Sequence, residues 1–329
     1  MLRDMTTPPD PQFRPPHPDD ADALLALRQA CAAADGHDPF SASDQLPTRD
    51  ELADQLRAAA PERYPLLTFQ NQVIAYGRIA DWTEADGTRV WLHCGWVSPA
   101  WRGKGVGTTL LRELESRIRR LAAAGGDGRW EFAANASSTE PEATRLLLDH
   151  GYHVAYTVIE LRLDWSAFEA LPGRSFWPAG FTTRSATPDD TPAIARSIDA
   201  AYRHEYAGDR YREVMDVAAY AAELCGAPYD LSLLQVAWAG DEVAGQVIPL
   251  IEHGWAEIYE VSVPPAYRRR GLARALLTRA LAELRRRGMA EVRIGTVLEF
   301  PTQAVALYRS LGFQPVKTFP RYRKPTDVA

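Results

Sequence analysis

The chain has 329 residues, of which 46% are hydrophobic and 24% charged, and its formal net charge is −6. This composition is typical of a globular protein with about two domains, and the negative balance without a long basic block argues against a nucleic-acid partner. No stretch approaches the ~20 apolar residues of a membrane-spanning helix, and the Pro-rich start has no signal-peptide core. Cys31, Cys94 and Cys225 show no disulfide or zinc spacing, so we expect a cytoplasmic protein without a membrane partner.

The first half of the chain opens with a helix-start signal. A Pro-Asp-Asp run precedes an apolar-periodic segment, and Asp19 or Asp20 is the candidate cap. Strand patterns follow on both sides of a short turn, at residues 64–69 and 73–79. The chain then reads V-S-P-A-W-R-G-K-G-V-G at residues 97–107, which we expect to connect a strand to a long helix.

The second half has the same order of elements. Its Pro-Asp-Asp run offers Asp189 or Asp190 as the cap. Strand patterns follow at residues 231–237, 243–250 and 255–263. Residues 272–287 carry apolar side chains at helical spacing, and the arginines that end this run suit the negative end of a helix dipole.

The two halves are copies of one pattern. Four landmarks recur in the same order, at offsets between 161 and 170 residues. A repeat of this kind indicates a duplicated structural unit. We therefore expect two tandem domains, residues 1–168 and 176–329, joined within a Pro- and Gly-punctuated stretch at 164–180.

Each copy contains the turn R-x-x-G-x-G/A between a strand and a long helix. The turn consists of Arg102, Gly103, Lys104, Gly105, Val106 and Gly107 in the first copy, and of Arg268, Arg269, Arg270, Gly271, Leu272 and Ala273 in the second. Small residues let a diphosphate approach the free N–H groups of the helix start, and arginines add positive charge. The spacing fits neither a P-loop nor a dinucleotide-binding GxGxxG motif. One such turn is explained by an ordinary helix start, but two copies favour a phosphate site.

Residues 263–273 resemble the acyl-CoA signature of the GNAT superfamily of N-acetyltransferases, and residues 304–313 resemble its closing helix-and-strand motif. The resemblance covers nearly the whole chain once per half, and the layout is similar to that of tandem members of the mycothiol synthase type. It implies an α/β fold, with a mixed sheet and flanking helices in each copy, and acetyl-CoA as co-substrate between two splayed strands. Pro301 stands where the family often has an Asn that binds the pantetheine arm.

The resemblance implies roles for residues of the second copy. Tyr308 is similar to the general acid that protonates the CoA sulfur, and Glu257 to the general base, with Glu260 as the reserve candidate. Strand alternation predicts that Glu257 shares one face with Val261 and Val263 and that Glu260 lies on the other. The backbone N–H groups of this strand end are the expected oxyanion donors. Taken alone, Tyr308 could also be a packed core aromatic residue, and either glutamate could be a solvated strand residue.

The first copy lacks these proton-transfer groups. Alignment on the proline before each turn puts Trp91 opposite Glu257, and the closing motifs put Leu147 opposite Tyr308. We therefore expect the second copy to be catalytic and the first to be non-catalytic. Because Gly105 is retained, the first copy could still hold CoA.

The acceptor is expected to be a primary amine of a small molecule or peptide. The segment 201–229 is rich in aromatic and charged side chains, namely Tyr202, Arg203, His204, Glu205, Tyr206, Asp209, Arg210, Tyr211 and Tyr220. Aromatic walls with carboxylates suit a cationic amine, although an amphipathic helix would also explain them. The histidines show no ligand spacing, so no metal is expected. A non-catalytic acyl-CoA-binding module and a pseudo-dimeric scaffold are the alternatives, and the chain is expected to be a monomer with an internal pseudo-dimer or a homodimer.

Overall fold

The computed structural model describes residues 10–58, 60–126, 128–172, 176–203, 211–252, 254–299 and 303–326. His204, Glu205, Tyr206, Asp209, Arg210 and Pro301 lie outside the described residues. Within the described ranges, no helix is long and apolar enough to cross a membrane. The chain forms two compact units: the first comprises the residues up to Thr83, Gly87–Ala155 and those from Phe319 onward, and the second comprises Glu84–Asp86 and Tyr156–Thr318.

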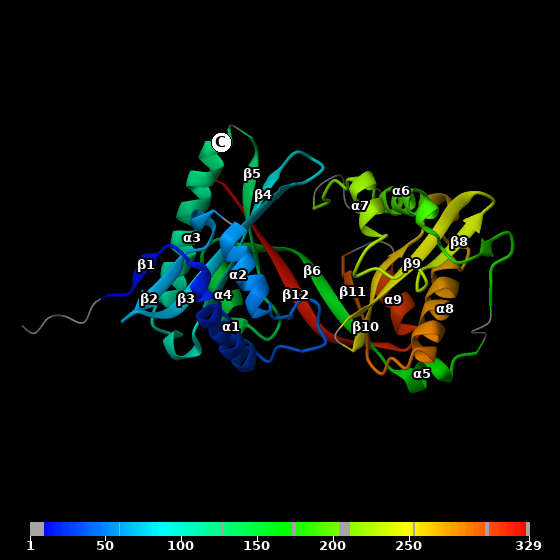
Figure 1. Cartoon of the computed structure of the whole chain (residues 1–329), viewed down its shortest axis with the longest axis horizontal. Coiled ribbons are helices and arrows are strands. Elements are labelled where there is room, and N and C mark those ends of the chain that lie inside the picture. The colour runs from blue at the N-terminus through cyan, green and yellow to red at the C-terminus, as the bar shows by residue number, and fades with distance from the viewer. Residues whose placement is uncertain are drawn as a thin grey trace, which may run out of the picture. The chain divides into compact units, whose positions relative to one another are not determined.

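The first unit is a mixed sheet covered on both faces. Its strands run in the order β1 (Gln12–Arg14), β2 (Leu66–Phe69), β3 (Gln72–Thr83), β4 (Arg89–Val97), β5 (Trp130–Asn135) and the end of β12 (Phe313–Pro325). β4 and β5 are parallel, and the other neighbours are antiparallel. One core cluster packs α1 (Ala21–Asp35) and α2 (Arg49–Ala58) on one face, and another packs α3 (Val106–Ala124) and α4 (Pro141–Asp149) on the other (Figure 1).

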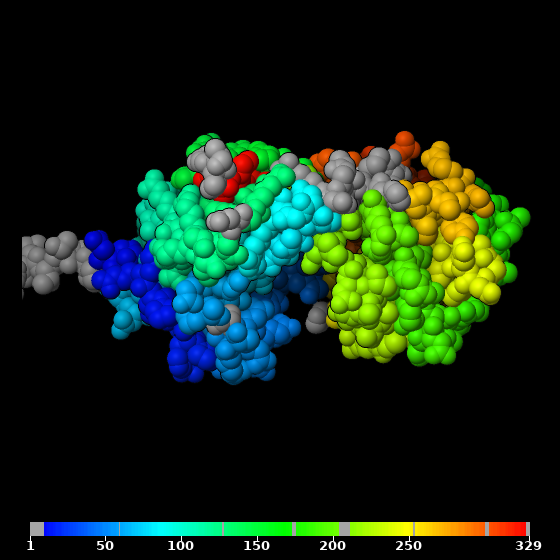
Figure 2. Space-filling model, turned by 90° about the horizontal axis from the view of Figure 1, so that it is seen from above, coloured from blue at the N-terminus to red at the C-terminus, as the bar shows by residue number. Residues whose placement is uncertain are grey.

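The second unit has the same layers. Its strands run in the order β7 (Thr182–Thr183), β8 (Gln235–Ala239), β9 (Glu242–Glu252), β10 (Trp255–Ser262), β11 (Val292–Val297) and β6 (His153–Leu163), with β10 and β11 parallel. One face packs against α6 (Thr191–Tyr202) and α7 (Val217–Glu223), whose yellow-green residues lie at the surface in Figure 2. The other face packs against α5 (Trp165–Glu169), α8 (Leu272–Arg286) and α9 (Ala304–Arg309).

Two long strands take each copy's chain into the sheet of the other unit. β6 follows α4 of the first copy, passes into the second unit between Ala155 and Tyr156, and pairs there with β11. β12 follows α9 of the second copy, passes back between Thr318 and Phe319, and its end pairs with β5. Each sheet is thus completed by the strand that ends the other copy.

The compact units therefore differ from the sequence halves 1–168 and 176–329. The sequence halves follow the repeat along the chain, so each closing strand is counted with the helix before it. The compact units instead count most of β6 and the end of β12 with the sheet that each strand enters. The stretch at 164–180, expected as a junction, lies inside the second unit and begins with α5.

The Pro-Asp-Asp runs start short 3₁₀ helices ahead of α1 and α6 rather than capping those helices with a side chain. In each copy the second Asp accepts a hydrogen bond from the backbone N–H three residues earlier and pairs with an arginine six residues earlier. The partners are His17 and Arg14 for Asp20, and Thr187 and Arg184 for Asp190. This local contact explains why the Arg and the Pro-Asp-Asp run recur together.

Candidate active site

A cavity of about 910 Å³ lies in the second unit where β10 and β11 part. The parallel pairing of these strands ends at Ile258 and Ile294, whereas β10 stays paired with β9 as far as Ser262. The backbone after Ile258 therefore borders the cavity on the side that β11 has left, and Val261 and Val263 line it. The volume lies within the range of ~300–1,000 Å³ that is usual for small-molecule sites.

The turn before α8 forms one end of this cavity. Gly271 is the N-cap of α8 with φ of 84°, and Arg269 has φ of 63°, so both adopt the left-handed conformation. Gly271, Leu272 and Ala273 line the cavity. The first turn of an α-helix leaves its N–H groups without intrahelical partners, and the helix dipole favours negative charge there. The cavity therefore ends in a site suited to a phosphate group.

The three arginines of this turn have different surroundings. Arg268 lines the cavity and donates hydrogen bonds to the carbonyl oxygens of Val263 (2.8 Å) and Ala201 (3.0 Å), which ties the turn to β10 and α6. Arg269 also lines the cavity. Arg270 is absent from the cavity lining, and its guanidinium lies over aromatic rings instead. Two of the three predicted arginines thus reach the cavity.

β10 contains a bulge just before this site. Its register with β9 passes from Ile258 opposite Pro249 to Glu260 opposite Ile248, which leaves Tyr259 as an extra residue. An extra residue interrupts the alternation of side chains between the two faces of a strand. The faces of β10 before and after Tyr259 must therefore be assigned separately.

The bulge brings the two glutamates of β10 to the same face. Glu257 is paired with Leu250 of β9 and Glu260 with Ile248, and both β9 residues belong to the core cluster that packs against α6 and α7. Val261 instead packs against the core cluster that contains α8. The prediction that Glu257 shares a face with Val261 and Val263, with Glu260 opposite, is therefore wrong. Its physical reason is the bulge, which no residue type in this segment marks.

Glu257 is a half-buried carboxylate that lines the cavity. Burial raises the pKa of the Glu257 carboxyl to about 7, and the charges of Glu160 and Glu252 act in the same direction. Glu257 is paired with Arg293 of β11. Glu160 of β6 is paired with Gly295, two residues further along β11. A carboxylate with this pKa is suited to accept a proton near neutral pH.

Glu260 is more deeply buried and is engaged with α6. The Tyr202 hydroxyl lies 2.9 and 3.1 Å from the two carboxylate oxygens of Glu260 and donates to them. Tyr202 lines the cavity, whereas Glu260 is absent from its lining. The structure therefore brings Glu257 to the cavity and sets Glu260 behind a tyrosine.

Tyr308 reaches the cavity from the opposite side. It lies in α9, is only 5% exposed, and packs its ring against Phe313 at a centroid distance of 6.1 Å. The cavity lining includes both Tyr308 and Glu257. Two groups capable of proton transfer, from α9 and β10, thus share one cavity with the turn before α8.

Several residues of the cavity carry no motif in the sequence. Val158 comes from β6, the closing strand of the first copy, and Thr296 and Val297 come from the end of β11. Gln303, with φ of 55°, and Arg274 complete this part of the lining. Val158 in particular could be found only by knowing that β6 enters the second sheet.

The first copy retains the geometry of the turn. Gly103 and Gly105 have φ of 70° and 81°, Val106 begins α3, and Gly107 follows in its first turn. Arg102 donates to the carbonyl oxygen of Val97, the last residue of β4 (3.2 Å), as Arg268 does to that of Val263, just after β10.

The surroundings of the first turn are different. Both oxygens of Asp35 accept hydrogen bonds from Arg102, at 2.5 and 2.8 Å. Lys104 donates to the carbonyl oxygen of Ala100 and lies over the ring of Trp101. Arg102 is thus neutralised by a carboxylate, whereas Arg268 is held by a backbone carbonyl of Ala201, the residue 166 positions after Asp35.

The counterpart of Glu257 in the first copy is Leu92 rather than Trp91. β4 runs without a bulge, and its parallel pairing ends at His93 as that of β10 ends at Ile258. The residue before the last pair is Leu92 in one copy and Glu257 in the other. The alignment to Trp91 is therefore wrong by one residue, because the bulge lengthens β10. The counterpart remains apolar, like the buried Leu147 opposite Tyr308.

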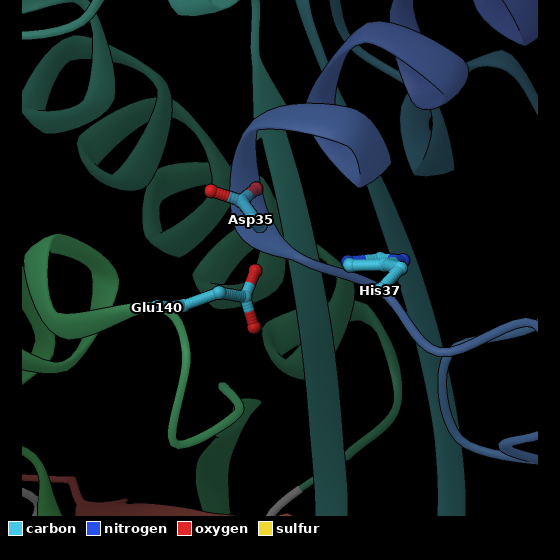
Figure 3. A group of neighbouring side chains, drawn as sticks. All are labelled: Asp35, His37 and Glu140. Carbon is cyan, nitrogen blue, oxygen red and sulfur yellow. The ribbon is translucent and has the colours of Figure 1, made fainter.

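A cluster in the first unit could in principle hold a cation. Ligand atoms of Asp35, His37 and Glu140 lie within 4.8 Å of one another, and Figure 3 shows the three side chains converging from the end of α1, the segment after it and the loop before α4. However, both Asp35 oxygens already bind Arg102, and His37 Nδ1 lies 3.3 Å from the carbonyl oxygen of Asp44. Arg102 supplies the positive charge here, so we assign no metal to this cluster.

Comparisons with known proteins agree with the two-copy organisation. Residues 27–152 and 194–313 match the acetyltransferase (GNAT) family. A mycothiol acetyltransferase from Nocardia farcinica is 32% identical over 302 residues, covering 90% of this chain and 91% of the relative. A GCN5-related N-acetyltransferase from Sphaerobacter thermophilus has a similar fold (TM-score 0.74, 24% identity, 97% of both chains). So does a tandem GNAT protein from the clavulanic acid biosynthesis pathway (TM-score 0.66, 18% identity, 97% of this chain and 100% of that one).

Proposed function

Because the chain belongs to the GNAT family of acetyltransferases, we propose that its second copy transfers an acetyl group from acetyl-CoA to a primary amine. The single observation that carries this proposal is the joint presence of Glu257, Tyr308 and the Gly271 turn around one cavity. In this proposal residues 176–329 form the catalytic copy and residues 1–168 form a non-catalytic copy. The raised pKa of Glu257 supports this assignment.

The residues of the second copy fit a CoA thioester. Acetyl-CoA supplies the activated acetyl group. The N–H groups of Gly271, Leu272 and Ala273 and the nearby Arg268 and Arg269 would hold its diphosphate. The edge of β10 that β11 leaves would hold the extended arm by backbone hydrogen bonds. The same edge, at Val261 to Val263, would donate an N–H to the thioester carbonyl oxygen as negative charge develops there.

Proton transfer would be divided between two side chains. An alkyl ammonium has a pKa of ~10 and is not nucleophilic, so the acceptor must lose a proton before it attacks. Glu257 would accept that proton, directly or through a water molecule. Tyr308 would donate a proton to the departing sulfur, because its hydroxyl belongs to the other wall of the cavity. Glu260 would act only through Tyr202.

The acceptor is proposed to be a small-molecule amine. The relative from Nocardia farcinica is named for mycothiol, which supports a small-molecule acceptor over a peptide. Tyr202, Tyr259 and Glu257 line the acceptor side of the cavity, and aromatic rings with a carboxylate suit a cationic amine.

The proposal is tested by release of free CoA thiol from acetyl-CoA in the presence of a panel of primary amines. The panel includes the free-amine form of mycothiol, small polyamines and a peptide with a free N-terminus. We expect thiol release with at least one small-molecule amine and its near loss in Tyr308→Phe and Glu257→Gln. Acetyl-CoA binding without turnover on any amine, or equal rates in the three proteins, would refute the proposal.

A further inference from the structure

A second cavity, of about 300 Å³, lies next to the phosphate turn of the second unit. Arg274 and Thr278 of α8 form one wall, Leu311 after α9 forms another, and Leu171 and Phe176 come from the segment that joins the two copies. Arg274 also lines the large cavity. The small cavity therefore continues the proposed acyl-CoA site past the turn that would hold the diphosphate.

Phe176 stands directly against this turn. A carbon of its ring lies 3.2 Å from the position that a Cβ would take on Gly271, yet the side chain is 59% exposed. Single exposed apolar residues are common on protein surfaces and need no explanation by themselves. The position of this one is specific, because its ring lies at the N-cap glycine of the proposed phosphate site and at the mouth of a cavity.

The chemistry of the small cavity suits a flat heteroaromatic group that carries negative charge nearby. Among the residues that the structure describes, its lining is largely apolar and includes no carboxylate. The guanidinium of Arg274 is held at the wall by Ser310, with hydrogen bonds to the hydroxyl (3.0 Å) and the carbonyl oxygen (3.3 Å). An exposed aromatic face beside a cation is the combination on which nucleic-acid bases stack in proteins that bind them without base-specific hydrogen bonds.

We propose that Phe176 and this cavity bind the adenosine end of the CoA thioester, so that Phe176 favours nucleotide-bearing donors over shorter pantetheine thioesters. The inference rests on the proposed function, because it assumes that the diphosphate lies at Gly271. It adds a contact from outside the two repeated motifs, since Phe176 precedes the second copy's first strand.

Calorimetric titration of the full chain with CoA and with 4′-phosphopantetheine tests this inference. The two ligands share the pantetheine arm, and only CoA carries the nucleotide. All proteins carry Gly105→Glu, so that the first copy's turn does not contribute to binding. We expect Phe176→Ala to weaken CoA binding about tenfold, as loss of one stacked base does, and to leave phosphopantetheine binding unchanged.

Matched variants keep the result interpretable. Phe176→Trp keeps an aromatic face and should retain CoA affinity, whereas Phe176→Leu keeps apolar bulk and should lose it. Phe40→Ala removes an exposed phenylalanine of the first unit and should change neither affinity. Unchanged CoA affinity in Phe176→Ala, or equal weakening of both ligands, would overturn the inference while leaving the proposed function intact. Failure of the protein with native Phe176 to bind either ligand would refute the proposed function itself.

Discussion

The turns of the two copies make the same local contacts in different surroundings. In each copy an arginine donates to the carbonyl oxygen of a valine at or just after the end of the preceding strand, and a glycine in the left-handed conformation caps the long helix. The first turn then meets Asp35, which neutralises Arg102, whereas the second opens on a cavity lined by Glu257 and Tyr308. The turn and the cavity with its two proton-transfer candidates are therefore separable parts of this fold.

The difference between the copies extends to the strand before the turn. β10 has the bulge at Tyr259, and β4 has none. In both copies the parallel strands part at the equivalent residue, so the separation of the two strands is retained. What the second copy adds is a carboxylate at the cleft and a tyrosine in the helix opposite. The two copies thus differ both in these side chains and in the backbone of the strand that carries the carboxylate.

The largest effect should come from blocking the second turn. Gly271→Glu should abolish turnover, because the new carboxylate repels a diphosphate at the helix start and obstructs its N–H groups. Gly105→Glu is the matched control, since both glycines have φ between 81° and 84°, where a substituted side chain strains the backbone at either position. Steady-state rates with acetyl-CoA check this, and equal loss from both substitutions would mean that the copies share the work.

Removal of the proposed base should rank next. Glu257→Gln should lower kcat/KM by about 10³-fold, within the usual range for loss of a general base, without a change in fold. Leu92→Gln introduces the same side chain at the structural counterpart in the first copy and should leave kcat/KM unchanged. A loss below tenfold in Glu257→Gln would assign the base elsewhere.

Loss of the proposed acid should have a smaller effect. Tyr308→Phe removes only the hydroxyl from a buried ring and should lower kcat about 10²-fold, with little change in acetyl-CoA affinity. Leu147→Met, at the matching buried position of α4, should leave kcat unchanged. If Tyr308→Phe weakened acetyl-CoA binding as much as it lowered kcat, the tyrosine would be a binding residue instead.

The smallest effect on activity is expected from substitution of His93. This buried residue of the first copy is the counterpart of Ile258 in the second. The Nε2 atom of His93 lies 2.7 Å from the Tyr152 hydroxyl, which donates to Glu115. Burial lowers the pKa of His93 to about 4, so the folded state resists a proton that the unfolded chain takes up near pH 6.5.

The stabilising contribution of neutral His93 is therefore complete above pH 6.5 and is lost as the pH falls to about 4. The loss should reach about 3–4 kcal/mol of the free energy of unfolding, from about 2.5 pH units at ~1.4 kcal/mol each. Denaturant titrations should show the stability of wild type falling relative to that of His93→Leu over this range, with unchanged kcat at pH 7.5. Parallel profiles would contradict the assignment.

Much of the site could be predicted from the sequence, because the motif residues are local. The turn at Gly271 and the closing helix with Tyr308 are set by short-range spacing, and the structure brings both to one cavity with Glu257. The copy-to-copy offset also found the equivalence of Leu147 and Tyr308, because no insertion separates the closing helix from the glycine that ends it.

The parts that could not be predicted depend on pairing between distant strands. A bulge is a property of two strands together, so the segment around Tyr259 alone predicted the wrong faces for Glu257 and Glu260 and the wrong counterpart, Trp91. The passage of β6 and β12 between the units is likewise invisible to local pattern, and with it the contribution of Val158 to the cavity.

The central claim is that Glu257 in the second copy accepts the proton of the acceptor amine. The charged and titratable groups on the strands around it are Glu160, Arg162, Glu252, Arg293, Tyr259 and Glu260. Burial and the neighbouring carboxylates raise the pKa of Glu257 to about 7, and only its deprotonated form can act as a base.

The most direct measurement is the dependence of kcat/KM on pH, in wild type and in Glu257→Gln. In wild type, kcat/KM should rise about tenfold per pH unit below pH 7 and bend at an apparent pKa of about 7. The residual activity of Glu257→Gln should lack that bend. A bend near pH 7 that persists unchanged in Glu257→Gln would contradict the claim.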